Sequence, residues 1–96
     1  MGWSAKVEFD WDAANIKHLA RHRITREDVE EVFENEPAIV DYEFLGQEDR
    51  WSAVGATNCL RVLVIVFTVR GERIRPITGW VADRRTREEY FRKKGW

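Results

Sequence analysis

The spacing of apolar residues changes along the chain and separates two helical segments from a β-rich half. Residues 7–11 alternate apolar and polar side chains, which predicts a short strand. In residues 13–22 the apolar positions recur every three or four residues, which predicts a helix that begins after the N-cap candidate Asp12. A second helix is expected after Thr25. The hydroxyl of Thr25 can accept a backbone N–H, and acidic residues in the first turn and an apolar stripe follow it.

From residue 38 onward the pattern is typical of β-strands. Strands are expected at residues 38–45, 50–56, 60–69 and 73–79, followed by a last helix from Arg84 to about Lys94. Pro76 cannot donate a ladder hydrogen bond, which indicates an edge position for its strand. We therefore expect one α+β domain over residues 1–96, with an ordered core at about 7–94. Its order is βααββββα, with an antiparallel sheet and helices packed on one face.

Length and composition are typical of one small domain. Ninety-six residues with 44% hydrophobic content suffice for a single core. Neither an apolar span of 18 residues nor a signal peptide is evident, so we expect a cytoplasmic protein without a membrane segment. Cys59 is the one cysteine, which excludes an internal disulfide. We expect Trp11 and Trp51 in the core, and Trp80 and Trp96 at a partner or nucleobase contact.

Charge is segregated along the chain although the net charge is −1. Residues 1–50 carry six Lys or Arg and 13 Asp or Glu, a net charge of −7, whereas residues 51–96 have a net charge of +6. A strand and the helix after it hold five arginines, which are Arg73, Arg75, Arg84, Arg85 and Arg87. Guanidinium groups bind phosphate in a forked geometry and stack on bases, so an RNA-binding patch is expected. The alternative is that these arginines pair with the acidic second helix.

Two histidines stand four residues apart on the first predicted helix. His18 and His22 have the spacing of a metal-chelating pair, but no Glu lies between them and no third ligand is evident, so no metal or other cofactor is expected. A histidine beside arginines suits proton transfer during phosphodiester cleavage, because imidazole titrates near neutrality. A histidine that packs against the helix turn is the structural alternative.

Four segments match, in order, the motifs of one protein family. Residues 9–12 are similar to F-x-W-D, residues 21–24 to K-H-G-V, residues 48–55 to E-x-R-W-x-x-x-G, and residues 74–90 to I-R-I-I-S-A-R-x-A-T-x(6)-Y. The chain in this respect resembles the BrnT family of type II toxins, small ribonucleases with a RelE-like fold. The resemblance covers nearly the whole chain.

The resemblance implies a toxin that cleaves RNA without a metal ion, by attack of the 2′-OH, and that forms an oligomeric complex with a cognate antitoxin. Together with the arginine cluster it assigns His22 as proton relay, Arg75 and Arg84 as phosphate clamps, and Arg50 and Tyr90 as supporting catalytic residues. RNA contacts are expected from Arg21, Arg73, Arg85, Arg87 and Trp80.

The chain departs from the family pattern near the end of the last strand. Trp80 stands where the family has an arginine, and Thr78 where it has a serine. An alternative hypothesis is therefore a non-catalytic module of the same fold, which binds RNA or a partner and in which Trp80 weakens activity. A third interpretation is that the acidic and basic halves of two molecules pair head to tail.

Overall fold

Three polar residues begin the three helices at the positions that the sequence predicts. The structure is a computed structural model that describes residues 7–95. The side chains of Asp12 and Thr25 each accept a backbone N–H from the third residue of the helix, and that residue's side chain accepts the N–H of the cap in return. Asp83 accepts the N–H of Thr86 at 2.8 Å. These bonds satisfy donors that the first helical turn cannot pair internally.

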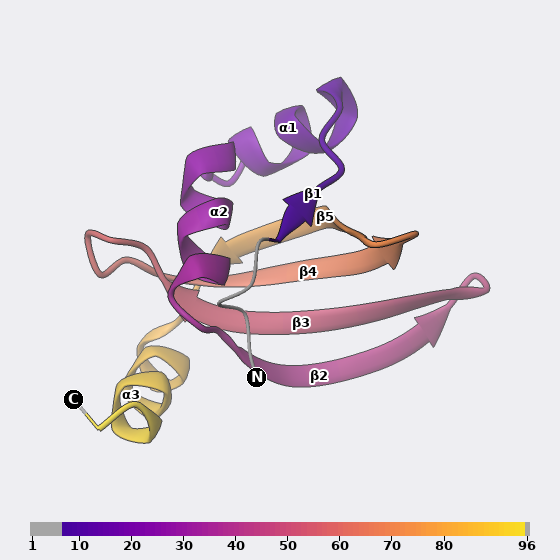
Figure 1. Cartoon of the computed structure of the whole chain (residues 1–96). Helices are drawn as coiled ribbons and strands as arrows, with labels where there is room; N and C mark the ends of the chain where they lie inside the picture. Colours follow the sequence, from indigo (N-terminus) through magenta and orange to yellow (C-terminus); the bar gives the residue numbers. More distant parts are fainter. Residues whose placement is uncertain (1–6, 96) are drawn as a thin grey trace.

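The elements follow one another in the predicted order βααββββα (Figure 1). They are β1 (Glu8–Phe9), α1 (Ala13–Ala20), α2 (Arg26–Glu34), β2 (Ala38–Leu45), β3 (Glu48–Ala56), β4 (Val62–Arg70), β5 (Arg73–Val81) and α3 (Arg84–Lys93). The fold class, α+β, is confirmed.

The five strands form one mixed sheet in the order β1-β5-β4-β3-β2. Four of them are antiparallel, but β1 pairs with β5 in parallel, with Glu8 opposite Arg73. The prediction of a wholly antiparallel sheet is wrong at this strand. The reason is connectivity: the chain leaves β1 through α1 and reaches its neighbour only after three further strands, so no tight hairpin imposes an antiparallel direction.

The predicted edge position of the Pro76 strand is also wrong as stated. β5 lies between β1 and β4, but β1 covers only its first two residues. The pairing of β4 with β5 shifts register where Phe67 is opposite Pro76, so the proline sits at a bulge. Beyond β1, the side chain of Asn15 in α1 donates to the Pro76 carbonyl at 3.0 Å. The fold therefore places α1 against this part of β5.

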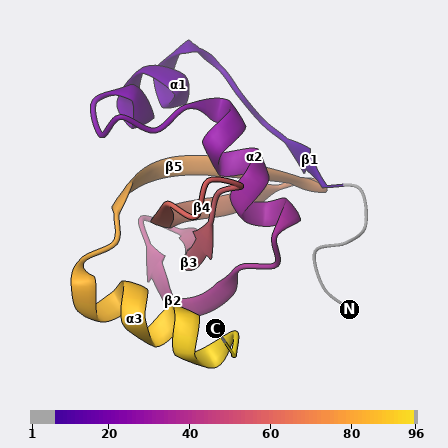
Figure 2. The same ribbon diagram turned by 90° about the vertical axis from the view of Figure 1, so that its left-hand side faces the viewer.

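Helices cover both faces of the sheet. On one face Ile65 of β4 packs in a core with Leu19 of α1 and Phe33 of α2. On the other, Val64 packs in a second core with Tyr90 of α3. Figures 1 and 2 show α1 and α2 above the sheet and α3 below it. The prediction that all helices share one face is therefore wrong, because a strand that is apolar on both sides needs cover on both.

The structure tests the predictions for two of the tryptophans. Trp11 and Trp51 are partly buried against the first core, as predicted, whereas Trp96 lies outside the described residues. Cys59 is exposed and its thiol is free. Within residues 7–95 no helix is long and apolar enough to span a membrane.

Candidate active site

A cleft of about 280 Å³ lies where α1 meets the start of β3, the end of β4 and the first half of β5. It is lined by Ala14, Asn15, His18, Glu48, Arg50, Arg70, Arg75, Pro76 and Ile77. Three of these residues are arginines and one is a glutamate, a lining that suits the binding of a phosphate group.

Glu48 joins two of the arginines. Its carboxylate accepts from Arg50 at 3.3 Å through one oxygen and from Arg70 at 3.4 Å through the other. Glu48 and Arg50 are two residues apart on β3, so both side chains project from the same face. The β3–β4 register, continued three residues past Trp51 and Phe67, brings Arg70 opposite Glu48. Strand geometry alone therefore assembles this triad.

The triad has an excess of positive charge. One carboxylate faces two guanidinium groups, and all three side chains are between about a quarter and 60% exposed. The Arg50 Nε atom is buried and has no hydrogen-bond partner among the described residues. The excess charge of the two guanidinium groups, rather than this enclosed atom, is what favours a bound phosphate.

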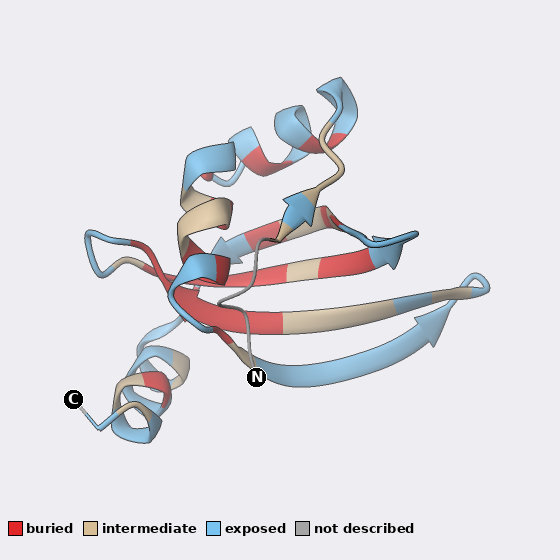
Figure 3. Ribbon diagram, viewed as in Figure 1, coloured by how far each residue is buried: buried red, intermediate tan, exposed pale blue. Residues whose placement is uncertain are grey.

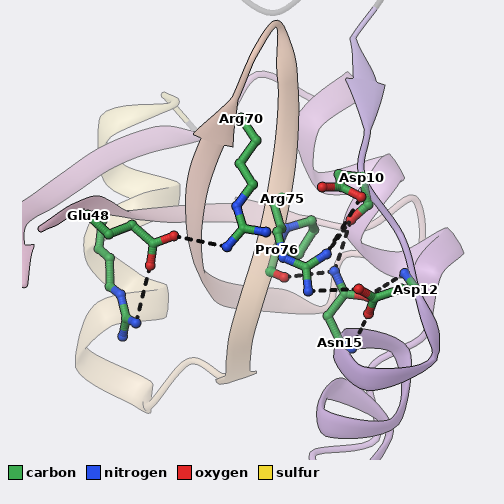
Figure 4. A network of polar contacts seen from close by, with 8 residues as sticks. Asp10, Asp12, Asn15, Glu48, Arg70, Arg75 and Pro76 are labelled. Carbon is green, nitrogen blue, oxygen red and sulfur yellow. Dashed lines mark hydrogen bonds and ion pairs between the residues drawn. The ribbon is translucent and has the colours of Figure 1, made fainter. Parts of the chain in front are cut away.

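Arg75 lies in the cleft but is held by a different set of acids. Its guanidinium is 2.9 Å from Asp12 and 3.6 Å from Asp10, and its side chain is only 16% exposed (Figure 4). The pKa of Asp12 is lowered, first because the Asn15 backbone N–H donates to it and also because Arg75 lies beside it. Arg75 thus ties β5 to the segment between β1 and α1, and its charge is matched by two carboxylates.

Asn15 of α1 also links the segment before α1 to β5. Its side-chain amide is buried and donates to the carbonyls of Asp10 and Pro76, both at 3.0 Å (Figure 4). A buried amide with both donors satisfied is costly to displace. The wall of the cleft that α1 contributes is therefore fixed to β5.

The two histidines differ in their relation to the cleft. His18 lines it, one helical turn after Ala14. His22, which sequence reasoning favoured as proton relay, lies after the end of α1, with its ring centroid 6.0 Å from that of His18. Both are exposed, as is Arg21 beside them. The imidazole inside the cleft is therefore that of His18.

The arginines of α3 lie away from this cleft. Arg84 is exposed and pairs with Glu88 at 3.1 Å, and Arg85 and Arg87 are exposed on the same helix. Six residues of β5 separate Arg75 from the end of the strand before α3, about 20 Å at 3.3 Å per residue. Arg73 projects at the start of β5, where it pairs with Glu8 at 3.5 Å. The structure does not gather the five arginines into one patch.

Tyr90 and Trp80 occupy contrasting environments. Tyr90 is 4% exposed and packs in the second core, and burial raises the pKa of its phenol. Trp80 pairs across the sheet with Val64, which places it on the α3 face, yet it is 43% exposed. No hydrogen bond or ring contact of its indole is found within residues 7–95. Tyr90 therefore anchors α3, whereas Trp80 is available to a ligand.

Sequence reasoning missed three residues of the cleft: His18 as a lining residue, Glu48 and Arg70. The E-x-R spacing on a strand was a usable signal, because alternate residues share a face. Arg70 had no such signal, since only the strand register brings it to Glu48. Among residues 7–95, no group of three His, Cys, Asp or Glu is placed to hold a metal ion.

Comparison with known proteins gives one match that spans most of the chain. Residues 11–86 match the family described as the ribonuclease toxin, BrnT, of type II toxin-antitoxin systems. No curated protein matches the chain in a sequence search. The family match includes α1, the whole sheet except β1, and therefore every residue that lines the cleft. The chain belongs to the BrnT family of type II ribonuclease toxins.

Proposed function

We propose that this toxin cleaves RNA without a metal ion, by attack of the ribose 2′-OH on the adjacent phosphate, in the cleft between α1 and strands β3 to β5. The observation that carries the proposal is the Glu48 carboxylate held between Arg50 and Arg70, with the His18 imidazole lining the same cleft. Family membership implies a ribonuclease, an RNA substrate and an antitoxin partner.

The chemistry requires two proton transfers and stabilisation of negative charge. The 2′-oxygen loses its proton and forms a bond to phosphorus, while the bond from phosphorus to the 5′-oxygen breaks. The leaving 5′-oxygen takes up a proton, so the products are a 2′,3′-cyclic phosphate and a 5′-hydroxyl. The phosphorane between them carries extra negative charge, which positioned guanidinium groups stabilise.

The residues of the cleft match these requirements. We assign Glu48 as the base that accepts the 2′-OH proton and His18 as the acid that protonates the leaving oxygen. Arg50 and Arg70 bind the phosphate, because their charges exceed that of the single carboxylate between them. Arg75 is a positioning residue, since its guanidinium is engaged by Asp10 and Asp12.

Residues outside the cleft have supporting roles in this proposal. Arg21 and His22 lie beyond the end of α1, next to His18, where they can contact an RNA strand that leaves the cleft. Trp80 offers an exposed indole on which a base can stack. The arginines of α3, which are Arg84, Arg85 and Arg87, add long-range attraction for RNA. Tyr90 acts through the packing of α3.

The test is incubation of purified protein with a labelled RNA oligonucleotide in EDTA. We expect cleavage products with 2′,3′-cyclic phosphate ends. An oligonucleotide with a single 2′-deoxy substitution at the cut site serves as the matched substrate control, and it should resist cleavage there. Loss of cleavage on adding EDTA, or unchanged cleavage of the 2′-deoxy substrate, would contradict the mechanism.

A non-catalytic RNA-binding module remains the second candidate, because Trp80 stands at the family's arginine position. In that case the protein would bind the oligonucleotide but leave it intact, and Trp80→Arg would restore cleavage. The same experiment therefore separates the two functions.

A further inference from the structure

β2 is an edge strand with an unusual surface. It lies at the end of the sheet, and among the described residues no strand pairs with its outer edge. Large apolar side chains that are 45% or more exposed follow one another along it, at Ile39, Val40, Tyr42, Phe44 and Leu45. Figure 3 shows that β2 is exposed over nearly its whole length. Soluble proteins usually protect such an edge with Lys or Pro, and β2 has neither.

We propose that the outer edge of β2 binds an extended segment of the antitoxin, which adds a sixth strand to the sheet. The inference rests on membership of a toxin-antitoxin family, which implies the partner, and the structure supplies the surface. Main-chain hydrogen bonds provide affinity in strand addition, and alternate side chains provide specificity. We expect apolar residues in the partner segment, because they would bury the exposed apolar side chains of β2.

The acidic residues of β2 define the rest of the partner's chemistry. Asp41 and Glu43 are two residues apart in the regular part of the strand, so they lie on one face. They belong to the half of the chain with a net charge of −7. Lysines or arginines at matching positions of the added strand would oppose them favourably. The same charges repel an RNA backbone, so β2 is not an extension of the RNA site.

A second copy of this chain fits the edge poorly. Antiparallel pairing of β2 with itself, centred on Asp41, Tyr42 or Glu43, places a carboxylate opposite a carboxylate. Like charges directly opposite one another destabilise a strand pair. A partner segment with basic residues avoids this repulsion between carboxylates, whereas a symmetric dimer of the toxin does not.

The edge lies close to the cleft without being part of it. Glu43 is opposite Arg50 in the register of β2 with β3, and Arg50 lines the cleft. A strand added to β2 would be two strand spacings from β3, about 10 Å. A segment that continues from the added strand is therefore placed to cover the cleft and block access of RNA.

The test measures binding of the antitoxin encoded by the adjacent gene to three single variants of the purified toxin. Phe44→Lys, at a side chain that is 64% exposed, introduces the positive charge that normally protects edges, and should weaken binding at least tenfold. Asp41→Lys should weaken it about fivefold to tenfold, because an attraction becomes a repulsion. Glu34→Lys makes the same charge change at an exposed position of α2 and should leave binding unchanged.

Several outcomes would overturn the inference. Binding of both β2 variants at the affinity of the unaltered toxin would do so, and so would equal weakening by Glu34→Lys. A free toxin that is dimeric by light scattering, and becomes monomeric on Phe44→Lys, would assign the edge to a second copy. Circular dichroism checks the fold of each variant. RNA cleavage by the free variants should equal that of the unaltered toxin; absence of cleavage in all of them would count against the proposed function and leave the binding result valid.

Discussion

Replacement of Glu48 by glutamine separates catalysis from binding. The change keeps the size of the side chain and removes the charge that faces Arg50 and Arg70. Loss of a positioned base costs about 10²- to 10⁴-fold in cleavage rate. RNA binding should instead become tighter, because the two guanidinium groups lose the carboxylate that competes with phosphate for them.

The expected effect on stability is small. Both ion pairs of Glu48 are partly exposed, and such pairs contribute about 0–1 kcal/mol each. A loss of activity in Glu48→Gln therefore cannot be attributed to unfolding if the melting temperature changes by only a few degrees.

The assay is single-turnover cleavage of a fluorescent RNA oligonucleotide in EDTA, with binding measured on a cleavage-resistant 2′-deoxy analogue. Glu88→Gln is the matched control, because it makes the same change at a Glu–Arg pair on α3. The control should cleave RNA like the unaltered toxin. Unchanged cleavage by Glu48→Gln, or equal losses in both variants, would refute the assignment of Glu48.

Three further predictions follow from other parts of the structure. His18→Ala should reduce single-turnover cleavage at least a hundredfold and His22→Ala less than tenfold, since only His18 lines the cleft; the reverse order would support the sequence-based assignment. Gly79→Ala should destabilise the protein by about 1–3 kcal/mol in urea titration, because the added Cβ would lie 2.8 Å from the Val64 carbonyl oxygen and 2.9 Å from Ile65 Cδ1; an unchanged midpoint would contradict this. Backbone N–H donors lower the pKa of Asp12 and Asp83, so these carboxylates stabilise the fold above pH 4 and this contribution is lost as the pH falls through their lowered pKa values. The double variant Asp12→Asn/Asp83→Asn should therefore show a smaller loss of stability between pH 5 and pH 2 than the unaltered chain.

The helices could be predicted from local signals, but the layering of the fold could not. Asp12, Thr25 and Asp83 mark helix starts because a capping side chain acts on residues next to it in the sequence. The parallel direction of β1 and the position of α3 depend on contacts between distant segments. The sequence of β4 is apolar on both faces, a pattern that requires cover on both and therefore conflicts with helices on one face alone.

In the candidate site, too, some features follow from the local sequence and others depend on contacts between distant segments. Glu48 and Arg50 share a face by strand periodicity, which the sequence contains. Arg70 joins them only through the β3–β4 register. Arg75 and Arg84 look alike in the sequence, yet one is enclosed by two aspartates and the other is exposed on α3. Clustering of arginines in sequence therefore did not predict clustering in space, because a nine-residue strand separates its ends by more than the reach of a side chain.

The most direct test of the cleft compares the cleavage rates of Arg70→Ala and Arg84→Ala under single-turnover conditions in EDTA. Each variant removes one guanidinium group and one ion pair with a glutamate, so net charge changes equally. If the cleft is the site of RNA cleavage, Arg70→Ala should lose about a hundredfold in rate, as expected for removal of a donor that stabilises the transition state, and Arg84→Ala should retain most activity. Full activity of Arg70→Ala together with loss in Arg84→Ala would place the chemistry at α3 and contradict the account.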